Sequence, residues 1–73
     1  MTVESAKAQT LSICEQLAAI ETKIGETCGL VLKAGMNMEY GKAKEAYSGA
    51  LMLDDMVTAL AADIRRLGRE LRH

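Results

Sequence analysis

The chain has 73 residues, of which 49% are apolar and 26% are charged, and its net charge is −1 at pH 7. This length allows one domain at most, and the balanced charge provides no basic field that would attract DNA or RNA. The longest uncharged stretch, residues 46–53, is far shorter than the roughly 20 apolar residues of a membrane span. We therefore expect a soluble protein with neither a nucleic acid nor a membrane as its partner.

We do not expect a disulfide or a bound metal ion to stabilise so small a core. The two cysteines form one disulfide at most, and the start of the chain, MTVESAKAQT, lacks the apolar core of a signal peptide. We therefore expect a reducing, cytoplasmic location. The single histidine is His73 and there is no Cys-x-x-Cys motif, so no metal site is predicted. Oligomerisation is the remaining way to stabilise the core.

The first half of the chain has the period of an amphipathic helix, with apolar residues in steps of three and four. We predict a helix over about residues 3–34, with Thr2 as its N-cap. Its predicted packing stripe comprises Val3, Ala6, Thr10, Ile13, Leu17, Ile20, Ile24, Thr27, Val31 and Ala34.

A turn is predicted over about residues 35–37. Gly35 suits the left-handed conformation that ends many helices, and Asn37 suits the N-cap of a following helix. Glu39 then lies where the positive end of that helix favours an acidic side chain.

The second half repeats the helical period, which predicts a helix over about residues 38–72. Its packing stripe comprises Ala43, Ala46, Ala50, Leu53, Val57, Leu60, Ile64, Leu67 and Leu71. A short link makes consecutive helices antiparallel neighbours. We therefore expect residues 1–73 to form a single all-α domain, an antiparallel two-helix hairpin whose two stripes face each other.

Each predicted helix also carries a second apolar stripe. Such stripes face water in a lone hairpin, so they predict a homo-oligomeric helical bundle, which is a four-helix bundle if the protein is a dimer. The alternative is one wide stripe on a loosely packed monomeric hairpin. The predicted oligomer interface consists of Leu11, Cys14, Ala18, Cys28, Leu32, Met52 and Met56.

Catalytic chemistry is not predicted, because no phosphate-binding loop, nucleophile triad or group of metal ligands occurs. We expect neither an enzyme nor a cofactor. Tyr40 and Tyr47 are seven residues apart and therefore share one helix side, with Lys44 between them, and such a group is able to stack a base and hold a phosphate. Rim packing is the plainer interpretation. The arginines of residues 65–72 favour the negative end of the helix, or form an anion-binding patch.

The second predicted helix resembles the helical-hairpin domain of phage anti-CBASS and anti-Thoeris sponges for cyclic oligonucleotides. The residues that carry the resemblance are Lys44, Glu45, Leu53, Asp54, Asp55, Val57, Ile64 and Arg66. They cover about a third of the chain. The chain departs from the family in having aspartates for glutamates, no proline in the turn, and Ala59 in place of an aromatic residue. The resemblance implies an oligomer that holds cyclic nucleotides between subunits, with Lys44 and Arg66 as cationic ligand residues.

Three functions follow as hypotheses. The first is a small binding protein of regulatory or inhibitory type, of phage or bacterial kind, that acts on a host protein through an apolar helix face. The second is a nucleotide sponge that blocks host anti-phage defence, with Tyr40, Lys44, Tyr47 and Arg66 as its ligand-binding residues. The third is a structural or assembly accessory protein.

Overall fold

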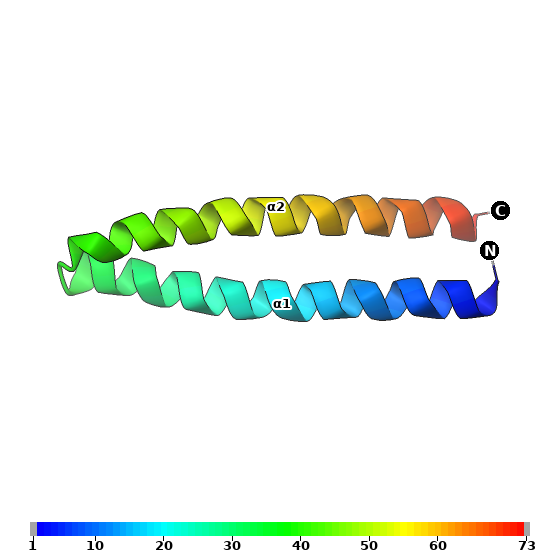
Figure 1. The fold of residues 1–73 in the computed structure, drawn as a ribbon, viewed down its shortest axis with the longest axis horizontal. Coiled ribbons are helices and arrows are strands. Elements are labelled where there is room, and N and C mark those ends of the chain that lie inside the picture. Colours follow the sequence, from blue (N-terminus) through cyan, green and yellow to red (C-terminus); the bar gives the residue numbers. More distant parts are fainter. Residues whose placement is uncertain (1, 73) are drawn as a thin grey trace.

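The computed structural model describes residues 2–72, which form two antiparallel helices, α1 (Val3–Met36) and α2 (Tyr40–Leu71). The helices lie side by side along their whole length, and the two ends of the chain lie together at one end of the hairpin (Figure 1). The predicted all-helical hairpin is confirmed, and each helix boundary lies within two residues of its predicted position. The molecule is a rod of 53 × 15 × 12 Å.

The start of α1 has the predicted cap. The Thr2 side chain accepts a hydrogen bond from the Ser5 amide at 3.1 Å, which satisfies one of the amides that an α-helix leaves free at its first turn. Glu4 adds an acidic side chain where the helix dipole is positive.

The turn differs from its prediction. Gly35 stays within α1, and the left-handed residue is Met38, with φ 59°. Asn37 is the C-cap of α1 rather than the N-cap of α2, a position that Glu39 takes without a side-chain cap. The amides of Asn37 and Glu39 both donate to the Lys33 carbonyl. At the reversal of the chain, these two amides satisfy a carbonyl of the last turn of α1, and Met38 takes the left-handed conformation. Gly35 is therefore not needed for that conformation.

The helices pack along one line, called the contact line here. Apart from Gly29 and Ala61, every described residue that is buried or largely shielded from solvent belongs to it. On α1 the contact line comprises Ala6, Gln9, Ile13, Gln16, Ile20, Lys23, Thr27, Leu30 and Ala34. On α2 it comprises Lys42, Ala46, Gly49, Leu53, Met56, Leu60, Asp63, Leu67 and Glu70.

The contact line corrects the predicted packing stripes. Only alternate members of each stripe, such as Ile20 and Leu60, are buried between the helices. The others are exposed, among them Leu17 at 44% and Ile24 at 51%. Each helix is therefore rotated by a fraction of a turn from the predicted orientation. Polar residues such as Gln16 occupy the contact line in place of larger apolar ones.

Candidate functional site: an exposed apolar side

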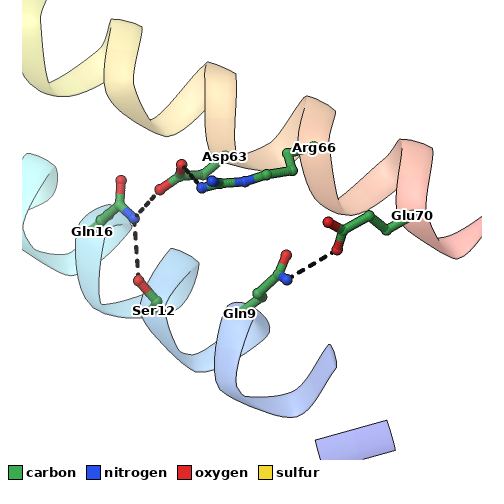
Figure 2. Close-up of polar contacts among 6 residues, drawn as sticks. All are labelled: Gln9, Ser12, Gln16, Asp63, Arg66 and Glu70. Atoms are coloured by element: carbon green, nitrogen blue, oxygen red, sulfur yellow. Dashed lines mark hydrogen bonds and ion pairs between the residues drawn. The ribbon is translucent and has the colours of Figure 1, made fainter. Parts of the chain in front are cut away.

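Polar bonds along the contact line hold the two helices in register near the open end of the hairpin. The Gln9 amide donates to Glu70 at 3.0 Å, and the Gln16 amide donates to Asp63 at 2.8 Å (Figure 2). Arg66 pairs with the second oxygen of Asp63. A one-turn slip of α2 along α1 breaks both glutamine bonds, because they join the two helices, whereas the Arg66–Asp63 pair lies within α2. Polar residues between packed helices are known to specify register.

Contact-line residues follow one another in alternating steps of three and four. The residues directly before each contact-line residue that begins a three-residue step, and before the last one of α1, form one side of the hairpin, which we call the polar side. Ser12 of α1 and Arg66 of α2 line one shallow hollow there, and Ala19 and Ala59 line another. The complete set is Ser5, Ser12, Ala19, Glu26 and Lys33 on α1, and Glu45, Met52, Ala59 and Arg66 on α2. Charged and hydroxyl groups occur at intervals along this side, as is usual for a solvated helix surface.

The residues directly after each contact-line residue that ends a three-residue step, together with Val3 and Ala43, each seven residues before the next member of the set, form the opposite side, which we call the apolar side. Because the preceding residues of both helices share hollows on the polar side, the following residues of both helices lie together on the opposite one. The set is Val3, Thr10, Leu17, Ile24 and Val31 on α1, and Ala43, Ala50, Val57, Ile64 and Leu71 on α2. None is charged and all are exposed.

The apolar side is a single surface that runs the length of the rod. Its large side chains, from Leu17 and Ile24 on α1 to Val57 and Ile64 on α2, are each about half exposed. Soluble monomers rarely expose contiguous apolar patches of more than a few hundred Å², and larger ones mark interaction sites. This side is therefore the candidate binding surface of the molecule.

The predicted oligomer interface maps only in part onto this surface. On α1, Leu11, Cys14, Ala18, Cys28 and Leu32 are all exposed. Helical spacing places Cys14 and Cys28 next to the apolar side, and the other three on the outer face of α1, away from α2. Met52 lies on the polar side, one heptad before Ala59. Met56 is on the contact line, where it lines a hollow with Ile20. The predicted set is thus divided between the border of the apolar side, the outer face of α1, the polar side and the contact line, and it does not form one surface in a single chain.

The candidate ligand residues do not form one site within a chain. Tyr40, Lys44 and Tyr47 are all exposed on the first turns of α2. Arg66 is 22 residues beyond Lys44, which at ~1.5 Å per residue places it about 33 Å away along the helix. A single ligand that contacts both ends requires two subunits.

The arginine-rich end of α2 contains a further hollow. It is lined by Ile64, Arg65, Gly68, Arg69 and Arg72, and it exists because Gly68 has no side chain to fill it. Arg66 is not part of it. Its helical position places it on the polar side, where its guanidinium pairs with Asp63, three residues earlier on the same helix (Figure 2). The predicted grouping of the arginines therefore holds for Arg65, Arg69 and Arg72 but not for Arg66.

Reactive and metal-binding groups are scattered over the described residues. Both Cys14 and Cys28 are free thiols. Within residues 2–72, no three His, Cys, Asp or Glu side chains are close enough together to hold a metal ion. Over the same range, neither helix combines the length and apolar character that crossing a membrane requires.

Comparison with known proteins adds no relative. No protein-family model matches the chain, and neither a curated protein nor a solved structure is significantly similar to it. The candidate surface therefore has to be interpreted from its own chemistry.

Proposed function

We propose that the protein is a small, non-enzymatic binding protein of regulatory or inhibitory type that acts in the cytoplasm as a homo-oligomeric helical bundle. The observation that supports this proposal is the apolar side, where uncharged side chains are exposed along both helices. The polar side of the same hairpin has the charges that a solvated surface needs, so the two sides serve different purposes.

The shape of the surface favours a helical partner over a small substrate. Small-molecule sites are concave and enclose most of their ligand, whereas the apolar side is long and nearly straight. An elongated apolar stripe with helical spacing is the kind of surface on which another amphipathic helix packs. A bundle of such helices, with its outer faces free, is suited to binding a host protein.

Native mass spectrometry of the freshly purified full chain tests the proposal, because it reports the subunit number and any retained ligand together. We expect a small closed oligomer, with the dimer at twice the 7.9 kDa of one chain. A monomer at every protein concentration, with no bound molecule, would contradict the proposal. An open series of ever larger species would favour the structural accessory protein instead.

A nucleotide sponge is the second candidate. Exposure of Tyr40, Lys44 and Tyr47 on neighbouring turns of α2 favours it, since aromatic rings beside a lysine are able to stack a base and pair with its phosphate. Isothermal titration with cyclic di- and trinucleotides tests this function. Binding that is lost in Lys44→Ala while the oligomer stays intact would support the sponge, and absence of heat with each nucleotide would reject it.

A further inference from the structure

We infer that the occupant of the apolar side is a second copy of this chain, related by a two-fold axis, so that two apolar sides face each other and both polar sides face outward. This inference rests on the proposed oligomeric function and names the surface and the partner that the function requires.

The exposed area of the single chain supports a partner of this size. A compact protein of 7.9 kDa exposes roughly 4,400 Å², whereas this chain exposes 5572 Å². The excess is roughly 1,200 Å², and a standard protein interface buries about 800 Å² on each partner. Covering one long side of the rod with an interface of this size therefore removes about two thirds of the excess.

The length and period of the surface favour a second copy over an unrelated peptide. Apolar residues repeat every seven positions from Val3 to Val31 and from Ala43 to Leu71, over most of a rod 53 Å long. A partner that covers it must supply two straight helices of equal length with the same seven-residue period. A second hairpin meets both conditions.

The absence of charge favours a symmetric contact. A two-fold axis brings the same surface of both copies together, so any charge near the axis meets its own copy. The defining residues of the apolar side are all uncharged, whereas the polar side has Glu26 and Lys33 on α1 and Glu45 and Arg66 on α2. Its defining residues therefore bring no charge against their own copies, and Lys7, Glu21 and Asp54 lie only along its border.

Two matched substitutions test which side pairs. Ile24 on the apolar side and Met52 on the polar side are exposed to similar degrees, 51% and 55%. Sedimentation equilibrium of the full chain should give a dimer for the wild type and for Met52→Glu. For Ile24→Glu, we expect a dissociation constant raised at least tenfold. An oligomer that survives Ile24→Glu but is lost in Met52→Glu would overturn the inference while leaving the proposed function in place.

Labelling of the native thiols tests the inference on the wild-type chain, so the result does not depend on whether a substituted chain folds. Cys14 and Cys28 border the apolar side and are exposed in a single chain. We expect their maleimide labelling to slow at least tenfold as the wild-type concentration rises through the dimer transition. The control is Ser48→Cys in a chain with Cys14→Ser and Cys28→Ser, whose outward-facing thiol should label at a constant rate. Labelling of Cys14 and Cys28 that is independent of concentration in a confirmed dimer would contradict the inference.

Discussion

The two long sides of this hairpin flank the same contact line, yet their chemistry differs. On the polar side, Glu26, Lys33 and Arg66 keep the surface hydrated, and on the apolar side Leu17, Ile24 and Ile64 take the corresponding positions. The fold of the single chain does not require this difference, because neither set is buried between α1 and α2. The proposed pairing of two apolar sides accounts for this difference.

The largest expected effect is loss of folding, and it distinguishes a substitution on the contact line from a substitution on an exposed side. Leu60 is 7% exposed between the helices, and a buried, unpaired carboxylate costs several kcal/mol. We expect Leu60→Asp to abolish the helical circular-dichroism signal. Leu17→Asp, at an exposed position of the apolar side, should retain the helical signal and lose association. Loss of helix in Leu17→Asp to the same extent would indicate that Leu17 is buried in the hairpin.

A pair of exposed alanines compares the two sides directly. Ala50 lies on the apolar side and Ala59 on the polar side, and both lie within α2. Ala50→Lys places a charge in the proposed interface, so we expect at least a tenfold weaker dimer, or about 1.4 kcal/mol. Ala59→Lys should leave the dissociation constant within twofold. Equal weakening by both substitutions, measured by sedimentation, would remove the distinction between the sides.

The two helices approach each other closely at Gly49. A Cβ at Gly49 would lie 2.7 Å from the Thr27 hydroxyl oxygen, whereas Gly25 has open space. Overpacking costs about 1–3 kcal/mol, which outweighs the gain of about 1 kcal/mol that alanine brings in helix propensity. We expect Gly49→Ala to lower the free energy of unfolding and Gly25→Ala to raise it. Urea unfolding of the two variants measures both changes.

A smaller effect is expected at the partner of Gly49. The Thr27 hydroxyl oxygen is buried and has no hydrogen-bond partner, whereas Thr10, Thr22 and Thr58 each donate to the carbonyl four residues earlier. Replacing an unsatisfied buried hydroxyl by a methyl group of similar shape removes a desolvation cost of about 1 kcal/mol. Thr27→Val should therefore raise the urea midpoint without changing the dissociation constant. A lower midpoint would show that the hydroxyl has a partner.

Much of the hairpin follows from local sequence signals. The seven-residue spacing of Ile13, Ile20 and Thr27, the cap at Thr2 and the break near residues 35–39 predict two helices and their ends. Each of these signals depends on residues that are close together in the sequence, so the helices and their ends can be predicted one segment at a time.

The rotation of the helices does not follow from such signals. Each helix has two adjacent apolar stripes, and the periodicity of one helix does not say which of them faces the other helix. Bonds between the helices, such as Gln16 to Asp63 and Gln9 to Glu70, favour the observed rotation. Periodicity alone therefore places Leu17, Ile24 and Ile64 between the helices and does not identify the apolar side as an exposed surface. Pairing the polar residues of the two halves is the signal that would have found it.

Small-angle X-ray scattering of the wild-type protein tests the central claim most directly, because it gives mass and length from one sample. Two hairpins joined through their apolar sides should have twice the 7.9 kDa mass of one chain and a longest dimension still close to 53 Å. A particle with the mass of one chain at every concentration, or a dimer with nearly twice that length, would contradict the account.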